Sequence, residues 1–450
     1  MKLLQKKKIV TKDGEIKMTR KEKRKQKGEL KIFNDVVQIM EQYFPELVMR
    51  MEKLTDERHQ SYVEYNMSTI GITRLAGLLC GIKSMRETTE ELNTGASIKN
   101  IGKLVGKELE EIPHYDTINN VFEKIKIEEL EKIQKYMVTR LIRSKMFEKY
   151  KYKGKYYQVV IDGTGLVKYK QKEDENCLIK TYNKGTTEEY KIYYRYVLEA
   201  KLVVGEMVIS IGTEFVENED EEIGKQDCEL KAFYRLAKKL KKEYPKLPII
   251  ITGDALYACD KVIEICKENK WEYILRQKDR IKSLSHGIRM WEADEKEEAE
   301  IKYCNEIGYG GYKLEKRTNV IKYYQKNEKT EETTEYLWIT SLKITEKNKK
   351  EIVYYGRQRW RIENEGFNIQ KNGTFDIERI YSRNYNALKA HYFFIQFAHT
   401  IRQLLEKGMK YIRELKMSIK EVSATIKEAL THTVINLAET SKIQLRFDTT

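Results

Sequence analysis

The sequence has few of the residues that stiffen or cross-link a chain. Only four prolines occur among 450 residues, which suits long helices and leaves few rigid linkers. The six cysteines never form a Cys-x-x-Cys pair, and the nearest two, Cys259 and Cys266, are seven positions apart. These spacings indicate neither a zinc module nor a disulfide framework, and they fit a reducing cytoplasm.

Long hydrophobic runs are also missing. No apolar run approaches the roughly 18 residues that a membrane span needs. No hydrophobic segment resembling a secretory signal stands at the start of the sequence. We therefore expect a cytoplasmic protein with no membrane partner.

The chain does contain enough apolar residues for a packed core, and it has an excess of positive charge. Hydrophobic residues make up 40% of the sequence, so global disorder is not expected, and the length suits two to four domains. The formal net charge is +15, which favours acidic partners, of which a phosphate backbone is the commonest. Residues 1–31 hold thirteen Lys or Arg against four Asp or Glu. They form a basic arm that either touches phosphates or only improves solubility.

Residues 32–150 are expected to form a helical N-terminal domain, because their apolar residues recur at steps of three and four. Within it, Asp116 or Thr117 is a candidate N-cap for a helix that would display Asn119 and Asn120. A short helix, a turn and this second helix would suit a DNA-binding helix-turn-helix. An ordinary capped helix in a bundle has the same pattern.

Residues 151–275 have the pattern of an α/β core. Strand-like segments occur at YYQVVIDGTGL, IYYRYVLEAKLVV, EMVISIGTEFV, PIIITGDALY and WEYILRQ, and helical segments at 227–244 and KVIEICKENK. Asp162 comes near the end of the first strand, and Asp254 comes just after the fourth. Such strand ends line a common crevice in an open α/β sheet, so the two carboxylates are predicted to be neighbours. Asp227, at the start of a helix, is a candidate N-cap or a residue that orients a metal ligand.

The rest of the chain divides into three parts. Residues 276–345 are strand-rich and polar, and predict a β-rich insertion. Residues 346–405 return to a helical pattern and are expected to complete the core, and 406–450 are expected to form a helical C-terminal tail.

Residues 358–373, QRWRIENEGFNIQKNG, place charged and apolar residues in one short stretch. On an α-helix, Arg359, Glu363, Phe367 and Gln370 fall on one stripe, with Lys371 about 80° from Glu363. A simple i,i+4 ion pair between Arg359 and Glu363 would explain part of the pattern. Together with the two strand-end aspartates, however, Glu363 would complete a pocket of three carboxylates.

Three carboxylates at such short distances would repel one another, and a pair of Mg²⁺ ions would neutralise their charges. Two such ions about 3.5–4 Å apart stabilise the attacking and leaving oxygens of a phosphodiester displacement. The residue types therefore suit nuclease or strand-transfer chemistry. Cations beside Glu363 would lie where DNA phosphates approach the ions.

The three blocks VVIDGTGL, ITGDALY and RWRIENEGFNIQKNG, in this order, resemble the DDE transposases of bacterial insertion sequences. More narrowly, they resemble the subgroup with a β-rich insertion and a Y-x2-R-x3-E-x6-K signature. The resemblance spans about residues 110–405. It implies an α/β fold, with a ribonuclease-H-like mixed-sheet core interrupted by the insertion. It also implies Asp162, Asp254 and Glu363 as catalytic and metal-binding residues, with two Mg²⁺ or Mn²⁺ ions per active site.

The signature is imperfect. Gly356 stands where the family has Tyr, with Tyr355 beside it, and Gln370 stands where it has Lys, with Lys371 next. Glu365 is a rival for Glu363, which the RWRIE block favours. The predicted DNA-binding residues are Arg359, Arg361, Lys371, Gln370 and Tyr355.

The function that the resemblance implies is DNA transposition, by cutting and joining the ends of an insertion sequence. Its partners would be double-stranded DNA at the element ends and the target, with a homodimer on DNA, no small-molecule substrate, and a location at the bacterial nucleoid. Three alternatives remain: a catalytically silent DNA-binding protein derived from a transposase, a metal-dependent nuclease without strand transfer, and a basic structural scaffold.

Overall fold

The computed structural model describes residues 9–10, 16–17, 32–218, 227–294, 299–310, 316–326, 331–437 and 443–447. Of the predicted basic arm it describes only β1 (Ile9–Val10) and β2 (Ile16–Lys17), which pair antiparallel. The rest of the arm, and with it the prediction of phosphate contacts, lies outside the described residues.

The centre of the molecule is one mixed sheet. Its first strands are β3 (Tyr157–Tyr169), β4 (Leu178–Tyr182), β5 (Tyr190–Val204), β6 (Met207–Val216), β7 (Ile249–Gly253) and β8 (Glu272–Arg276). The strands β6, β5, β3, β7 and β8 lie side by side in that order. The strands β3, β7 and β8 are mutually parallel, and β5 pairs antiparallel with both β3 and β6. This is the strand order of a ribonuclease-H-like core, so the predicted fold class is confirmed.

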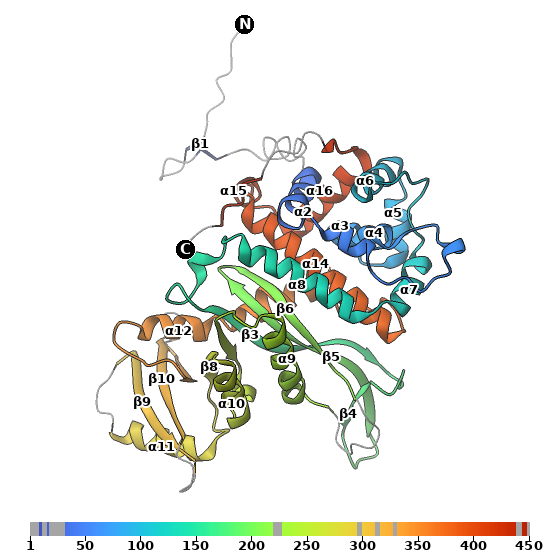
Figure 1. The fold of residues 1–450 in the computed structure, drawn as a ribbon. Coiled ribbons are helices and arrows are strands. Elements are labelled where there is room, and N and C mark those ends of the chain that lie inside the picture. Colours follow the sequence, from blue (N-terminus) through green and yellow to red (C-terminus); the bar gives the residue numbers. More distant parts are fainter. Residues whose placement is uncertain are drawn as a thin grey trace.

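The β-rich segment after β8 extends the same sheet. It contains α11 (Lys282–Asp294), β9 (Ile301–Tyr309), β10 (Lys316–Lys326) and β11 (Thr333–Thr340). β11 returns beside β8, pairing Trp338 with Arg276, and β10 and β9 follow outward. Figure 1 shows this part at the lower left of the molecule, beside α12. The pairing brings residues of the insertion to the edge of the core.

Helices cover the sheet. α9 (Glu229–Glu243) and α10 (Asp260–Asn269) connect β6, β7 and β8, and α12 (Lys349–Arg357) follows the insertion. The periodic apolar residues of α9 pack on the sheet, where Gly212 of β6 lies against Leu236 and Leu240. The helices from the two ends of the chain form a layer on the upper side of the sheet in Figure 1.

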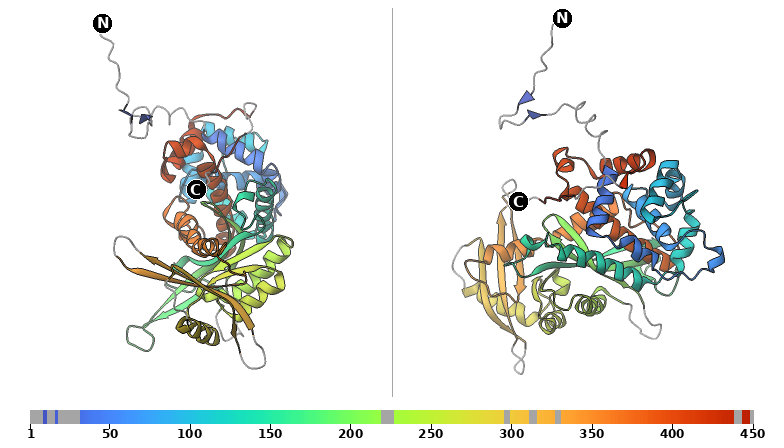
Figure 2. Two further views of the ribbon diagram at one scale, coloured as in Figure 1. Left: turned by 90° about the vertical axis from the view of Figure 1, so that its left-hand side faces the viewer. Right: turned by 45° about the horizontal axis from the view of Figure 1, so that its top comes forward.

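That helical layer is built from both ends of the chain. Its first helices are α2 (Ile32–Tyr43), α3 (Leu47–Glu52), α4 (Met67–Leu79), α5 (Met85–Leu92), α6 (Gly95–Val105), α7 (Tyr115–Lys124) and α8 (Ile127–Arg143). Of these, α2, α4, α7 and α8 pack against α14 (Tyr385–Gly408), and α15 (Lys410–Glu414) and α16 (Ile419–His432) complete the layer. Figure 2 shows α14 and α16 among the N-terminal helices. Nearly all of α14 is buried, so the two ends share one core.

The helix predicted to display Asn119 is a bundle helix. Its N-cap is His114, where Asp116 or Thr117 was expected. Asn119 forms a hydrogen bond with His391 of α14 (Oδ1 to Nε2, 2.8 Å), and Phe122 stacks on Phe394. These contacts turn the face with Asn119 toward α14, which favours the ordinary capped helix over a DNA-reading helix.

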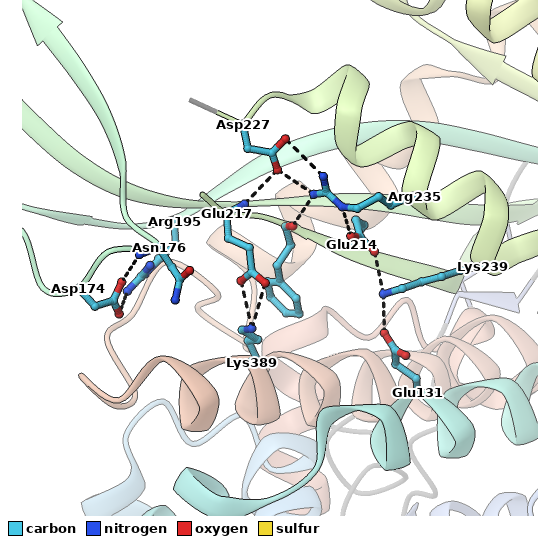
Figure 3. Close-up of polar contacts among 11 residues, drawn as sticks. Glu131, Asp174, Asn176, Arg195, Glu214, Glu217, Asp227, Arg235, Lys239 and Lys389 are labelled. Atoms are coloured by element: carbon cyan, nitrogen blue, oxygen red, sulfur yellow. Dashed lines mark hydrogen bonds and ion pairs between the residues drawn. The ribbon is translucent and has the colours of Figure 1, made fainter. Parts of the chain in front are cut away.

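A network of ion pairs ties α8 and α9 to the sheet (Figure 3). Arg235 of α9 pairs with Asp227 at 2.7 Å and with Glu214 of β6 at 2.6 Å. Lys239, one turn later, pairs with the same Glu214 at 2.7 Å and with Glu131 of α8 at 2.8 Å. Asp227 is therefore a partner of Arg235; α9 has Cys228 as its N-cap, without a side-chain capping bond. Within the described residues, no helix is long and apolar enough to cross a membrane.

Candidate active site

The sequence predicted that Asp162 lies near the end of its strand. In the structure it lies in the middle of β3, because β3 continues to Tyr169. Its neighbour β7 is shorter. The parallel register pairs Tyr157 with Ile249 and Val160 with Thr252, and β7 ends at Gly253. Asp162 and Asp254 each stand two residues after this last pair, Asp162 on β3 and Asp254 just after β7. Neighbouring strands lie about 4.8 Å apart, so the register alone brings these two acids to the same level of the sheet.

Asp254 stands directly after β7, where the chain turns away from the sheet. Its Oδ1 accepts a hydrogen bond from the backbone N–H of Leu256 at 2.8 Å and caps the short helical turn Ala255–Tyr257. This bond fixes the direction of the carboxylate at the mouth left by the end of β7. Behind it, Tyr257 is fully buried.

Glu363 comes from a π-helical turn, Ile362–Asn368, between α12 and α13 (Ile369–Asn372). Two apolar side chains of this turn, Ile362 and Phe367, pack on the sheet against Val160 and neighbouring valines. Because Val160 and Asp162 face the same side of β3, the turn is anchored beside Asp162. Glu363 remains half exposed above it. Such π-helical turns are rare and occur frequently at functional sites.

The three predicted acids line one pocket of about 520 Å³. Its walls come from β3, from the segment after β7, from β8 and β11, and from the α12–α13 region. The basic residues of the pocket are Arg276, Lys278, Arg357 and Arg359. Carboxylates and cations therefore meet in one depression at the carboxyl ends of the parallel strands, as expected for this class of sheet.

Arg359 joins two of the three acids. Its Nη1 lies 3.2 Å from Asp162 Oδ2 and 2.9 Å from Glu363 Oε1, and its Nη2 lies 3.2 Å from Glu363 Oε2. Burial opposes the charge of this guanidinium, but the hydrogen bonds and charges of the carboxylates raise its pKa overall. The i,i+4 pair that sequence allows is present, and it is part of a larger bridge to β3.

The pKa of Asp162 is raised to about 7. Burial is the largest cause, Arg359 opposes it, and the negative charges of Glu363 and Glu229 add to it. Glu229, at the start of α9, accepts hydrogen bonds from the hydroxyls of Tyr257 (2.5 Å) and Tyr196 (3.0 Å). The charge of Arg359 and the hydrogen bond from the Gly163 N–H lower this pKa, but burial outweighs them, so a further positive charge nearby would favour the ionised carboxylate.

An aromatic and cationic wall borders the acids. Tyr336 and Trp338 of β11 stack with centroids 5.6 Å apart. Arg276 lies over both rings, and Arg357 lies over Tyr336 at 4.6 Å. Sequence reasoning did not assign Arg276, Arg357 or Tyr336 to the site. Arg276 ends β8 and Arg357 ends α12, whereas Tyr336 is brought there by the pairing of β11 with β8. No local pattern in the sequence marks that pairing.

Two of the predicted DNA-binding residues are buried and do not reach the pocket. Gln370 has no exposed surface, and its Nε2 contacts Gln396 Oε1 and His399 Nδ1, both at 2.9 Å. Tyr355 is 7% exposed and donates its hydroxyl hydrogen bond to the Tyr150 carbonyl at 3.1 Å. The prediction that Gln370 shares a stripe with Arg359 and Glu363 is wrong, because the π-helical turn changes the helical register between them.

The other predicted contacts lie at the surface. Lys371 pairs with Glu378 at 2.7 Å and does not line the pocket. Arg361 hydrogen-bonds Gln358 and lies over the ring of Trp360 at 5.1 Å. Of the five predicted DNA-binding residues, Arg359 alone is in the pocket lining.

The structure also separates Glu363 from its rival. Glu365 lies away from the pocket, 3.7 Å from Lys407 Nζ. Gly356, which replaces the signature Tyr, lies against the indole of Trp338: a Cβ at this position would come within 2.8 Å of the ring. The aromatic side chain at this point of the pocket is thus supplied by β11.

The acids are not arranged as a closed metal site. Within the residues that the structure describes, no three Asp, Glu, His or Cys side chains are gathered closely enough to hold an ion. Arg359 instead neutralises Asp162 and Glu363. The predicted convergence on one pocket holds, while tight coordination geometry among the three acids is not present.

Two protein-family models match parts of this chain. Residues 220–401 match the transposase DDE domain, and residues 48–137 match the model described as DDE_Tnp_1-associated. The chain belongs to the DDE transposases.

The DDE domain match includes Asp254, Arg359 and Glu363, whereas Asp162 lies before it. The associated match covers α4 to α7 and most of α3 and α8, so the helical layer of this DDE transposase accompanies the catalytic domain. No curated protein matches the chain. Among solved structures, it is similar to a piggyBac transposase in a cryo-EM synaptic complex with hairpin DNA. The TM-score is 0.44 and the identity 11%, over 88% of this chain and 80% of that chain.

Proposed function

We propose that the chain cuts and joins the ends of a mobile DNA element, with Asp162, Asp254 and Glu363 as the catalytic carboxylates. One observation carries the proposal: three acids from separate segments, in the order typical of the family, line the same pocket. A structural scaffold has no need for this convergence. The homodimer on DNA and the action on chromosomal DNA belong to the same proposal.

The donor set of the pocket suits Mg²⁺ or Mn²⁺, because both prefer carboxylate oxygens. Asp162, Asp254 and Glu363 would hold the ions, two per active site. When bound, the ions would supply a Lewis acid for phosphodiester displacement. The bridge from Arg359 to Asp162 and Glu363 has to open for this, so the guanidinium becomes available to a phosphate.

The residues of the chain have distinct roles in this proposal. Asp254 is held in direction by the Leu256 N–H, and Glu363 by the docking of Ile362 and Phe367 on the sheet. Arg359 would grip a phosphate next to the reacting bond, as a forked cation does well. Arg276 and Arg357, on the aromatic wall, would contact the backbone or an unstacked base of the same DNA end.

The experiment uses DNA from both sides of the gene as the substrate and Mg²⁺ as the metal. Glu363→Gln is expected to abolish end cleavage and strand transfer, while Glu365→Gln, two residues away and paired with Lys407, retains both. Both substitutions keep the size of the side chain and remove one negative charge. A difference between the two variants therefore reports a catalytic role of Glu363 and not the loss of a charge in this segment. Equal activity of the two variants would contradict the proposed site.

The same assay separates the alternatives. Nicked or cut ends without joined products in a plasmid target would indicate a nuclease that lacks strand transfer. Tight DNA binding by the wild-type chain with no metal-dependent breakage would indicate a silent DNA-binding protein. Cleavage followed by joining supports the proposal.

A further inference from the structure

A second cavity lies away from the acids. It has a volume of about 670 Å³ and is lined by six Lys or Arg residues and two glutamates. The segment before β3, the α9–β7 connection, α10 and β8 form one wall, and β9, β10 and β11 of the insertion form the other. We call this cavity the basic groove. Its charge is far more one-sided than that of the active-site pocket, where three acids face four cations.

The basic groove lies at the opposite end of the parallel strands. Tyr156, Pro248 and Glu272 line it where β3, β7 and β8 begin, whereas Asp162 and Asp254 lie where β7 ends. The six residue steps from Tyr156 to Asp162 span about 20 Å at roughly 3.3 Å per residue. A duplex with a phosphodiester at the acids would need about six base pairs to cover that distance. The groove is thus a separate site.

Three lysines of the groove are available to a ligand. Lys246, Lys267 and Lys270 are exposed, and among the described residues their ammonium groups have no hydrogen bond or ion pair. Lys241 has a different role, since it donates to the carbonyls of Pro245 and Asn269 and joins the ends of α9 and α10. The groove therefore combines a fixed frame with free positive charges.

Lys270 also violates a local preference. It ends α10 in the left-handed conformation, with φ of 59°, where glycine is the usual residue because a Cβ is strained there. A lysine at this position keeps a charge in the groove at the expense of local stability. Strain of this kind is concentrated at functional positions.

The acids do not cancel this charge. Glu272 is engaged within the protein, accepting hydrogen bonds from the hydroxyls of Tyr156 at 3.2 Å and Ser341 at 2.6 Å. Glu306 is the other carboxylate of the lining. The cations outnumber the carboxylates by three to one, so an anionic ligand is favoured.

We propose that the basic groove binds the phosphate backbone of a DNA duplex segment other than the one at the catalytic acids. This rests on the proposed function, which makes DNA the anion that the chain meets. The groove reads no base, because lysines act as point charges on phosphates. The insertion gains a role in it, since β9, β10 and β11 supply the second wall.

The test measures DNA binding by the full chain without metal, so that catalysis does not enter. The variant carries Lys246→Gln, Lys267→Gln and Lys270→Gly. Its control carries Lys238→Gln, Lys242→Gln and Lys261→Gln, three exposed lysines of α9 and α10 outside the groove lining. Both variants remove three charges. Binding to a duplex of about 30 base pairs is followed by fluorescence anisotropy between about 50 and 200 mM salt.

The groove variant is expected to bind about tenfold or more weakly than the control, and the slope of log affinity against log salt should fall by about 2–3. Its melting temperature should stay the same or rise, because glycine relieves the strain at position 270. Equal affinity and slope for the two variants would overturn the groove. Failure of the catalytic proposal shows separately, as absence of cleavage by the wild-type chain.

Discussion

At the scale of single residues, Asp162 and Asp254 are the same amino acid in two different environments. Asp254 is fixed by a backbone N–H at the open end of β7. Asp162 is mostly buried in mid-strand, and its pKa is raised to about 7 by burial first and by Glu363 and Glu229 next. Without a metal, the carboxyl of Asp162 therefore keeps its proton to a higher pH than an ordinary aspartate does.

This gives a prediction for metal-free stability. The pKa of Asp162 is higher in the folded state, so folding takes up a proton at intermediate pH. The contribution of this proton to the free energy of unfolding is fully present below about pH 4 and is lost by about pH 7. Asp162→Asn, neutral at every pH, does not lose it. With a chelator present, the free energy of unfolding of the variant minus that of the wild type should rise between those pH values by on the order of 2–4 kcal/mol. Denaturant titrations at several pH values measure this, and a difference independent of pH would refute it.

Arg359 is expected to act through its fork. Its two nitrogens contact Asp162 and Glu363 together, a geometry that the single ammonium of lysine does not reproduce. Arg359→Lys should lower the rate of end cleavage by about 10–100-fold, the equivalent of one to two charged hydrogen bonds. Arg361→Lys, two residues away and outside the pocket, is the control. Comparable losses in the two variants would remove the special role of Arg359.

At the scale of elements, the π-helical turn explains where sequence reasoning failed. Regular helical spacing placed Gln370 on the side of Glu363. The turn Ile362–Asn368 changes that register, so Glu363 faces the pocket and Gln370 faces the core. Asp162 and Asp254 could be singled out because each follows an apolar strand, and Glu363 because the RWRIE block resembles the family signature. A single π-helical turn leaves no mark in an apolar pattern, and neither does the β8–β11 pairing that brings Tyr336 to the pocket.

The buried side of this element gives the next prediction. Gln370 joins Gln396, His399 and Lys201, whose Nζ lies 3.4 Å from the Gln370 amide oxygen. Gln370→Ala should cost about 1–3 kcal/mol, because it leaves buried polar groups without partners. Restoring the signature residue with Gln370→Lys should cost more, since a second ammonium would be buried beside Lys201. Lys371→Gln, which breaks only a surface pair, should cost less than about 1 kcal/mol.

Chemical denaturation of the three variants decides between these outcomes. A Gln370→Lys protein as stable as the wild type would show that the position tolerates the family residue. The departure from the signature would then need another explanation than the buried network.

At the scale of the whole molecule, the predicted helical domain and C-terminal tail share a core around α14. Arg402 of α14 is buried and donates to the Leu79 carbonyl at 2.9 Å and to Ser423 of α16 at 2.7 Å. The periodicity of apolar residues predicted helices within residues 32–150, and the structure has helices there. Their packing against residues some 300 positions later has no local signal, because any apolar helical face fits many partners. The exact domain boundaries stay a prediction.

A shared core predicts a single unfolding transition. All four tryptophans, Trp271, Trp291, Trp338 and Trp360, lie in the catalytic part, so their fluorescence reports only on that part, while circular dichroism reports on every helix. Phe394→Ala removes a fully buried ring that stacks on Phe122 and should cost about 3–5 kcal/mol. Both signals should shift together to lower denaturant concentration, because one cooperative unit unfolds as a whole. Tyr62→Ala, at an 85% exposed aromatic residue, should shift neither. If Phe394→Ala moved the dichroism transition and left the fluorescence transition in place, the helical layer would be an independent domain, and α14 would not connect it to the catalytic sheet.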